Sequence, residues 1–239
     1  MPARPPLLLL SATEREAAPT LEALAAVPAA VPLGRAWEGR VAAGEVVLLV
    51  AGVGKVNTAA ALALALQRWQ PRAVLQFGIG GAYVGSFLSV GMAALASAEV
   101  HVDCGAGHGS SWRDLRSLGF PLLEGPPPRY NEIPTDAALT GLLAERLRLP
   151  GVRFATSEQV TGDPDEAERV QRAHDVSIES MEGAAAAQVC LALGVPFAEL
   201  RAVSNIVGER DRTAWDVPAA VRAVNEAVAT ALAEAGTIR

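Results

Sequence analysis

The sequence contains few cysteines and no long apolar run. Its two cysteines, Cys104 and Cys190, lie far apart, which gives neither a disulfide framework nor the closely spaced thiols of a metal site. No window approaches the roughly 18 apolar residues that a membrane-spanning helix needs. The apolar run at residues 7–10 is too short for a signal peptide. These absences predict a soluble, cytoplasmic protein without a membrane partner.

The sequence also lacks a concentration of positive charge. The formal net charge is −6, and acidic and basic residues are interspersed, so no basic stripe is offered to the phosphates of a nucleic acid. Lys55 follows two glycines in Gly52-Val-Gly-Lys55. That stretch has neither the spacing of a phosphate-binding loop nor the third glycine of a dinucleotide fingerprint. We expect no nucleic-acid partner, and the sequence implies no cofactor.

What the sequence does contain is enough apolar material for a large core. The chain has 239 residues, of which 51% are hydrophobic, and a chain of this length buries roughly three quarters of its extended surface when it folds as one domain. Apolar runs without alternation, such as residues 7–12, are typical of parallel strands covered on both faces. These runs alternate with helical stretches, without repeats or an obvious linker. The sequence predicts an α/β fold in a single domain of residues 1–239.

The positions of the elements follow from periodicity, glycine and proline. Strands are expected at residues 7–12, 45–50, 73–77, 89–97, 152–160 and 196–205, with a short one before Glu182. A glycine-rich turn is expected at residues 78–81. Helices are expected at residues 13–26, 135–149, 183–193 and 217–235, from residues 52–54 to about 69, and from about 161 to 173.

Polar side chains and glycines gather at the ends of the expected strands. Glu182 stands between a short strand and an alanine-rich helix, and Glu16 lies three residues after Thr13. Both glutamates have an ordinary structural explanation, because Glu182 could cap a helix, and Thr13 with Glu16 fits a capping box. Open α/β sheets, however, bind ligands at the carboxyl ends of their strands. The clustering therefore favours a ligand site formed by Glu16, Glu182, residues 78–81, Ser204 and Asn205.

A metal site is not indicated. His101, Asp103 and His108 occur close together in a glycine-rich stretch, but their spacing matches no standard metal site. We interpret the stretch as an ordinary loop and expect no metal.

Five motifs are spread over almost the whole chain: Glu14-Arg-Glu16, Gly52-Val-Gly-Lys-Val-Asn-Thr-Ala, Gly78-Ile-Gly-Gly, Met181-Glu182-Gly-Ala-Ala and Arg201-Ala-Val-Ser-Asn205. Together they resemble the nucleoside phosphorylase and nucleosidase superfamily, and within it the methylthioadenosine/S-adenosylhomocysteine nucleosidase branch. The resemblance implies a central mixed sheet flanked by helices, a small-molecule nucleoside substrate, and cleavage of the bond between ribose and purine. It also implies a homo-oligomer, either a dimer or an assembly of dimers.

The resemblance further implies roles for individual residues. Met181 and Glu182 would hold the sugar and Glu16 would activate water, although Glu14 is close enough to compete. Negative charge suits this chemistry, because the ribose becomes oxocarbenium-like as the base departs. The other expected catalytic residue is Asn205, and the other expected substrate contacts are Gly78, Ile79, Gly80, Gly81, Val160, Ser204 and Asp211.

Two departures from the superfamily refine the expected reaction. Phosphorylases carry Gly-Asp-Pro-x-Arg and Arg-x-Gly-Thr elements for phosphate, whereas this chain has Ser11-Ala-Thr-Glu-Arg-Glu16 and Gln76-Phe-Gly-Ile-Gly-Gly81. Phosphate would meet carboxylates here, so water is the expected nucleophile. Asn205 stands where adenine-specific nucleosidases have Asp, and its amide suits the acceptors of a 6-oxopurine. Because Asn is no general acid, the leaving purine is activated by hydrogen bonding alone or by Asp211.

The Ser-Asn pair followed by Val207-Gly-Glu-Arg-Asp-Arg-x-x-Trp215 is similar to the futalosine hydrolases of menaquinone biosynthesis. That resemblance implies hypoxanthine and dehypoxanthine futalosine as products. Candidates for binding the aromatic acid on the 5′ carbon are Tyr83, Trp112 with Arg113, and Arg129 with Tyr130.

Three alternatives remain: an adenine nucleosidase, a purine nucleoside phosphorylase, and a non-catalytic nucleoside-binding module. Asn205 argues against the first, the missing phosphate residues against the second, and the two retained carboxylates, Glu16 and Glu182, against the third.

Overall fold

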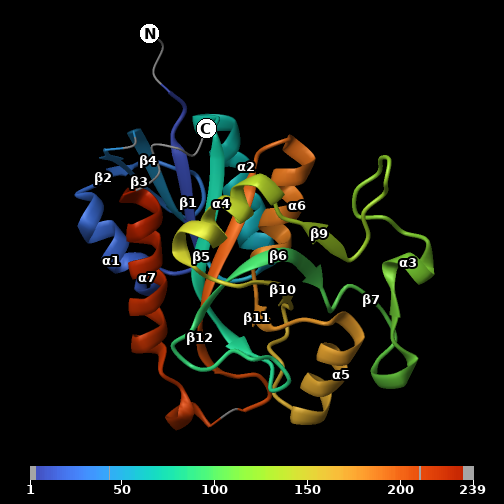
Figure 1. Ribbon diagram of the computed structural model, residues 1–239. Coiled ribbons are helices and arrows are strands. Elements are labelled where there is room, and N and C mark those ends of the chain that lie inside the picture. Colours follow the sequence, from blue (N-terminus) through green and yellow to red (C-terminus); the bar gives the residue numbers. More distant parts are fainter. Residues whose placement is uncertain (1–3, 43, 210, 234–239) are drawn as a thin grey trace.

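The computed structural model describes residues 4–42, 44–209 and 211–233, which form a sheet flanked by helices (Figure 1). The strands are β1 (Leu7–Ser11), β2 (Val27–Ala29), β3 (Arg35–Val41), β4 (Gly44–Val50), β5 (Ala73–Ala82), β6 (Ala93–His101), β7 (Gly105–Ala106), β8 (Arg113–Asp114), β9 (Glu132–Pro134), β10 (Gly151–Thr156), β11 (Ile178–Ser180) and β12 (Phe197–Ile206). The helices are α1 (Glu14–Leu24), α2 (Lys55–Trp69), α3 (Leu115–Leu118), α4 (Ala137–Leu147), α5 (Pro164–His174), α6 (Gly183–Leu193) and α7 (Val217–Ala233), with short 3-10 helices η1 (Gly109–Ser111) and η2 (Arg212–Ala214).

The main sheet is mixed, as expected. Its strand order is β11-β10-β6-β12-β5-β1-β4-β3-β2, with β9 beside β6. The strand β1 runs parallel to both β4 and β5, whereas β3 is antiparallel to β2 and β4. A further antiparallel pairing joins β11 to β5, so β5, β12, β6, β10 and β11 close on themselves. The predicted α/β class is confirmed, while this closure was not predicted.

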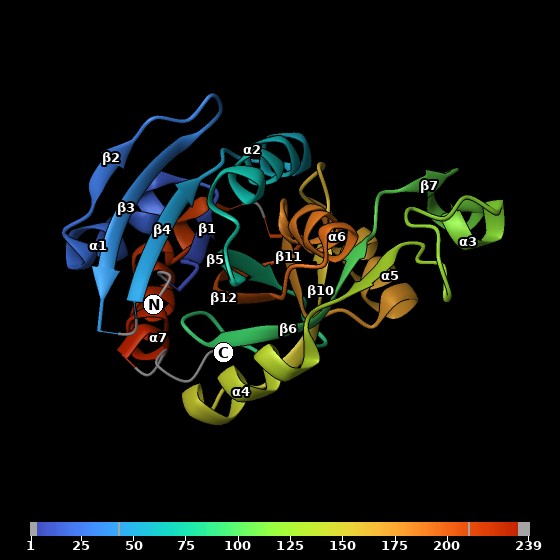
Figure 2. The ribbon, with the colours of Figure 1, turned by 90° about the horizontal axis from the view of Figure 1, so that it is seen from above.

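The first strand shows why the sheet is covered on both faces. Leu7 and Leu9 pack into a core with residues of α1, α4 and α7, whereas Leu8 and Leu10 pack into another with residues of α2 and α6. Successive side chains of a strand point to opposite faces, so an all-apolar strand requires a cover on each. Figure 2 shows α2 and α6 side by side, with α4 and α7 across the sheet from them.

Several predicted boundaries are wrong. The glycines at residues 78–81 form no turn but lie within β5, because that strand continues to pair with β12 and β11 through them. The strand expected at residues 152–160 ends at Thr156, after which the Ser157 hydroxyl donates to the carbonyl of Gln159 and closes a turn. The strand expected at residues 89–97 instead spans Ala93–His101.

Other expectations agree with the structure. The predicted helices are present within a few residues of their expected bounds, and the described part of the last one ends at Ala233. No helix among the described residues is long and apolar enough to cross a membrane. Both cysteines are free, and Cys190, a residue of α6, is buried.

Candidate active site

Two of the predicted carboxylates come together around a buried arginine. Arg201, in the middle of β12, donates from Nη2 to Glu182 Oε2 over 3.1 Å, and its Nη1 lies 4.0 Å from Glu16 Oε1. All three residues are buried, with Arg201 only 2% exposed. A guanidinium between two carboxylates allows two negative charges to stay in an interior that would otherwise expel them.

Glu182 is positioned by tertiary contacts and does not cap a helix. It occupies the residue before α6, but its side chain makes no capping hydrogen bond there. Its Oε1 accepts instead from the N–H of Gly54, the residue before α2, over 3.1 Å. The capping explanation of Glu182 is therefore wrong. The Glu182 carboxylate instead joins the start of α2, through Gly54, to β12, through Arg201.

Glu16 forms only half of the expected capping box. Thr13 does cap α1, since its hydroxyl oxygen accepts from the N–H of Glu16 over 3.2 Å. The carboxylate of Glu16 turns toward β5, where Oε1 accepts from the N–H of Ile79 over 3.0 Å and Oε2 from the Thr13 hydroxyl over 2.6 Å. The neighbouring Glu14 is exposed and paired with Arg35. Of the two glutamates, only Glu16 reaches the buried cluster.

Arg201 was not among the predicted site residues. The signals in the sequence are a cation inside a largely apolar strand, two residues after Glu199, and the place of that cation in the motif Arg201-Ala-Val-Ser-Asn205. Its guanidinium also donates to the carbonyl of Ile79 over 3.0 Å and to Glu199 Oε1 over 2.6 Å. Burial alone would lower the pKa of Arg201, but the carboxylates of Glu199, Glu182 and Glu16 raise it well above its ordinary value. Arg201 therefore remains charged.

The glycines of β5 make room for this cluster. A Cβ on Gly78 would lie 2.7 Å from both Arg201 Nη1 and Glu16 Oε1, and one on Gly80 would lie 2.6 Å from Cγ2 of Ile178 in β11. A Cβ on Gly81 would come within 3.1 Å of Asn205 Nδ2. Of the predicted contacts, Gly78 and Ile79 thus lie beside Glu16, whereas Gly80 and Gly81 lie beside Ile178 and Asn205. In the structure the backbone of residues 78–81 lies against protein side chains, and the N–H of Ile79 donates to Glu16.

Ser204 and Asn205 stand at the end of β12, close to Gly80 and Gly81. The Ser204 hydroxyl donates to Asn205 Oδ1 over 2.8 Å, and Asn205 Nδ2 donates to the carbonyl of Ile206 over 3.0 Å. These two bonds fix the orientation of the amide. The amide nitrogen carries a second hydrogen, which is available to an acceptor on a ligand.

The remaining predicted contacts are spread more widely. Met181 is half-buried between β11 and Glu182. Val160 lines a separate cavity of about 780 Å³ beside α5. Asp211 is exposed and accepts from the N–H and the hydroxyl of Thr213, bonds that lower its pKa. The structure does not bring Asp211 to the Arg201 cluster, and Arg210 lies outside the described residues.

The residues considered for binding the aromatic acid on the 5′ carbon lie in different environments. Tyr83 is fully buried and donates to Glu179 over 3.0 Å, so its ring belongs to the core. Trp112 lines the same cavity as Val160. The ring of Tyr130 faces the guanidinium of Arg116 at 4.6 Å.

The histidine and aspartate considered as metal ligands have other partners. His101 Nε2 lies 3.1 Å from Gln188 Oε1, and Asp103 pairs with Lys55 over 2.6 Å. Burial, together with the charge of Lys55, lowers the pKa of His101 to about 4. In the described ranges no group of three or more His, Cys, Asp and Glu side chains could hold a metal ion.

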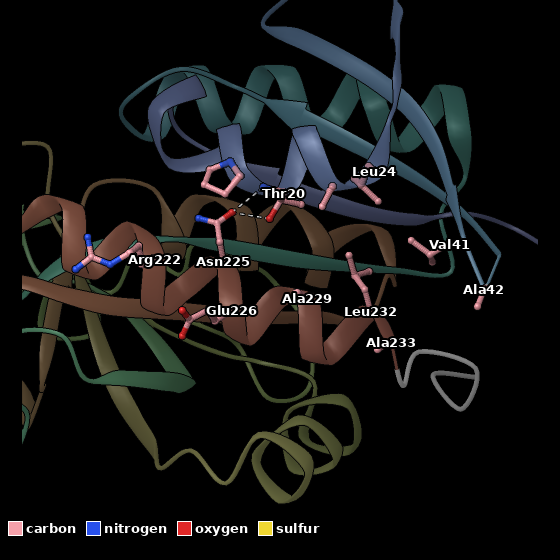
Figure 3. Close-up of a pocket in the computed structure, with 12 residues that line it drawn as sticks. Thr20, Leu24, Val41, Ala42, Arg222, Asn225, Glu226, Ala229, Leu232 and Ala233 are labelled. Atoms are coloured by element: carbon pink, nitrogen blue, oxygen red, sulfur yellow. Dashed lines mark hydrogen bonds between the residues drawn. The ribbon is translucent and has the colours of Figure 1, made fainter.

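A further cavity of about 490 Å³ lies between α1 and α7 (Figure 3). None of the predicted site residues lines it. Its polar feature is Asn225, whose Oδ1 accepts from the N–H and the hydroxyl of Thr20 over 3.0 and 2.6 Å, and whose Nδ2 donates to the carbonyl of Glu16 over 2.9 Å. The side chain of Asn225 therefore holds the helix that carries Glu16.

Comparison with known proteins identifies the family. Residues 6–236 match the Phosphorylase superfamily. The chain is 44% identical to futalosine hydrolase of Thermus thermophilus over 85% of this chain and 88% of that protein. It is 30% identical to 5′-methylthioadenosine/S-adenosylhomocysteine nucleosidase of Geobacillus sp. over 74% of this chain and 75% of that protein. The native futalosine hydrolase of Helicobacter pylori has the same fold, with a TM-score of 0.82 at 21% identity, covering 95% of this chain and 96% of that one. The chain belongs to the phosphorylase superfamily.

Proposed function

We propose that the protein hydrolyses the N-glycosidic bond of futalosine and releases hypoxanthine and dehypoxanthine futalosine, a step of menaquinone biosynthesis. The observation that carries the proposal is the 44% identity with a futalosine hydrolase over 85% of the chain. The adenine nucleosidase of Geobacillus sp. is less similar, at 30% over 74% of the chain. Catalysis in this proposal belongs to Glu16, Glu182 and Asn205.

Glu16 acts as the general base. The two donors that it accepts from, the Thr13 hydroxyl and the N–H of Ile79, fix its carboxylate. It orients a water molecule and takes a proton from it as the water oxygen bonds to the anomeric carbon of the ribose. Glu182, beside Met181, accepts hydrogen bonds from the ribose hydroxyls, and both carboxylates stabilise the oxocarbenium-like transition state.

The leaving purine takes the electron pair of the broken bond. The second hydrogen of the Asn205 amide donates to an acceptor on the base and stabilises its negative charge, and Ser204 holds the amide for this role. An amide donor suits the O6 and N7 acceptors of hypoxanthine. In this scheme activation comes from hydrogen bonding, and the proton for the base comes from solvent.

The charges of the cluster support water as the nucleophile. Arg201 contacts Glu16, Glu182 and Glu199, so its positive charge is already balanced by carboxylates. A phosphate dianion placed there would meet net negative charge. This argues against the phosphorylase alternative.

The test is release of free purine from futalosine, inosine and methylthioadenosine, each with and without phosphate, followed by chromatography. The proposal requires phosphate-independent release of hypoxanthine from futalosine. Adenine release from methylthioadenosine would support the adenine nucleosidase, phosphate dependence would support a phosphorylase, and no release at all would support a binding module.

We further propose that residues 1–239 form one domain that acts in the cytoplasm as a dimer or an assembly of dimers. The free cysteines are in keeping with a reducing compartment. Support for assembly comes from apolar side chains exposed on the packed pair α2 and α6 and just before α2. They are Val53, Val56, Leu64, Leu191 and Leu193.

A further inference from the structure

A second pair of carboxyl groups lies behind Arg201, away from the substrate residues. Glu99 of β6 and Glu199 of β12 are both 0% exposed. Glu199 Oε1 accepts from Arg201 Nε over 2.6 Å, and Glu99 Oε2 accepts from the Thr156 hydroxyl over 2.6 Å. Among the described residues, the other two oxygens, Glu99 Oε1 and Glu199 Oε2, have no hydrogen-bond donor. Two buried acceptors without a donor are costly, which points to a proton between them.

The two oxygens meet at Gly183, the first residue of α6. A Cβ on Gly183 would overlap Glu199 Oε2 and would lie 2.6 Å from Glu99 Oε1. Only glycine therefore leaves room for the pair. Two ionised carboxylates that converge on one point repel strongly in a dry interior, and a proton between them removes the repulsion.

The hydrogen bonds indicate which residue carries the proton. The Thr156 oxygen accepts from the N–H of Ala184 over 2.8 Å, so its own hydrogen is directed at Glu99 Oε2. The free position on Glu99 is then Oε1, which faces Glu199. Burial raises the pKa of Glu99 well above its ordinary value, and the neighbouring charge of Glu199 raises it further. Glu199 Oε1 accepts from the Arg201 guanidinium, so Glu199 is the acceptor of the pair.

We propose that Glu99 is a protonated acid that donates to the Glu199 carboxylate, and that this acid pair positions Arg201 and, through it, Glu16 and Glu182. The part of this proposal that concerns Glu16 and Glu182 as catalytic residues rests on the proposed function. The groups that face the pair are Arg201 of β12, Thr156 of β10, and the first peptide of α6. Glu99 and Glu199 are positioning residues, because they act on the reaction only through Arg201.

Matched amide variants test the proposal, since it assigns different charges to two residues of the same type. Glu99→Gln replaces a neutral donor by another neutral donor, so kcat and KM for futalosine should stay within about twofold of the wild type. Glu199→Gln removes the charge that holds Arg201, so kcat should fall on the order of tenfold or more while KM changes less, because the loss is in transition-state stabilisation. Glu199→Asp, which keeps the charge, should recover part of the kcat.

Either of two kinetic results overturns the proposal. One is a Glu99→Gln variant as impaired as Glu199→Gln, and the other is a Glu199→Gln variant with wild-type kcat. Thermal unfolding shows which variants are folded. If a variant does not fold, the infrared spectrum of the wild type, described next, decides in place of its kinetics.

Two readouts do not depend on activity and separate this proposal from the proposed function. Infrared spectroscopy at neutral pH should show the carbonyl stretch of a buried protonated carboxyl group in the wild type but not in Glu99→Gln. A wild type without that band overturns the acid pair even if futalosine is cleaved. A crystal structure of Glu199→Gln should show Arg201 displaced from Glu182, and an unmoved Arg201 overturns the positioning role. If the band and the displacement are present but no nucleoside is cleaved, only the proposed function fails.

Discussion

Glu14 and Glu16 lie two positions apart in the chain, but they differ in exposure and in their partners. Glu14 is exposed and paired with Arg35, while Glu16 is 7% exposed and held by the N–H of Ile79. Glu16→Gln should lower kcat for futalosine by roughly 10² to 10⁴, the usual contribution of a general base. Glu14→Gln is the matched control and should leave kcat within about twofold of the wild type. Purine release measures both, and a larger loss in Glu14→Gln would assign the water to the other carboxylate.

His101 makes the stability of the fold depend on pH. Burial, with Lys55 nearby, holds its pKa at about 4 in the folded protein, whereas an unfolded chain has the ordinary value of about 6.5. Between these values the unfolded state binds the proton and the folded state does not, so acid favours unfolding by about 1.4 kcal/mol per pH unit.

The measurement is the free energy of unfolding of wild type and His101→Gln in denaturant at several pH values. The stability advantage of the wild type should be constant above about pH 7 and should shrink as the pH falls through 6.5 toward 4. The comparison cancels the other titrating groups, among them His174. A difference that does not change with pH would mean that His101 has the same pKa in the folded and the unfolded protein.

At the scale of single residues, the sequence indicated which side chains to consider but not how they are joined. Glu182 could be predicted because it lies between a strand and a helix, and Glu16 because it lies in the first turn of the helix that follows β1. Arg201 could not be predicted as a site residue, because its contacts are to Ile79, Glu182 and Glu16, which no local pattern connects. The choice between Glu14 and Glu16 likewise depended on a backbone N–H from β5.

At the scale of elements, α1 depends on a side chain of α7. The Asn225 amide accepts from the N–H of Thr20 (Figure 3). It also donates to the carbonyl of Glu16, the group that would accept from that N–H in a regular helix. Pro19 lies beside this opening and has no N–H. Asn225→Ala leaves these buried groups unpaired and should lower the free energy of unfolding by about 2 to 4 kcal/mol. Because α1 carries Glu16, kcat should fall as well.

The control for this prediction is Thr230→Ala on the same helix. Thr230 is exposed, and within the described part of the chain its hydroxyl bonds only to the carbonyl of Glu226, one turn earlier. Its replacement should change the unfolding free energy by less than about 0.5 kcal/mol. Denaturant unfolding of both variants gives the comparison, and equal losses would show that Asn225 does not join the helices.

The glycine-rich stretch of β5 shows why some elements could not be predicted. The sequence predicts that the strand ends at residue 77 and that the three glycines of a turn at residues 78–81 let backbone amides come close to a ligand. The strand continues because Gly78 faces Arg201, Gly80 faces Ile178 and Gly81 faces Asn205. Each of these neighbours comes from a distant part of the chain, so the need for glycine is tertiary.

At the scale of the whole molecule, the α/β class could be predicted from apolar runs and helical periodicity, but the closure of the sheet could not. The closure depends on an antiparallel pairing of Ile178 and Glu179 with Ala82 and Gly81, about a hundred positions apart in the chain. It matters for the site, because it brings the start of α6, and with it Glu182, next to β5. The fold class is thus encoded locally, and the position of the site is encoded by long-range pairing.

The outer face of α2 and α6 bears on the assembly of the whole molecule. Val56 of α2 is 79% exposed and Leu193 of α6 is 57% exposed, which is unusual for apolar side chains on two packed helices unless another surface covers them. Val56→Glu places a charge on that surface, and burying an unpaired charge in an interface is strongly unfavourable. Light scattering after size-exclusion chromatography should give the mass of a dimer or larger assembly for the wild type and a lower mass for the variant.

The control for this surface is Val84→Glu. Val84 is 77% exposed but follows β5 at a different place in the fold, so the charge should leave the mass unchanged. A wild type with the mass of a single chain would exclude assembly through any surface under those conditions. Loss of assembly in Val84→Glu but not in Val56→Glu would place the interface at the end of β5, on the side of Asn205.

Because Glu16, Glu182 and Arg201 all come from one chain, a monomeric Val56→Glu variant that keeps purine release would show that one subunit suffices for the chemistry. Loss of activity together with assembly would mean that the site needs the second copy.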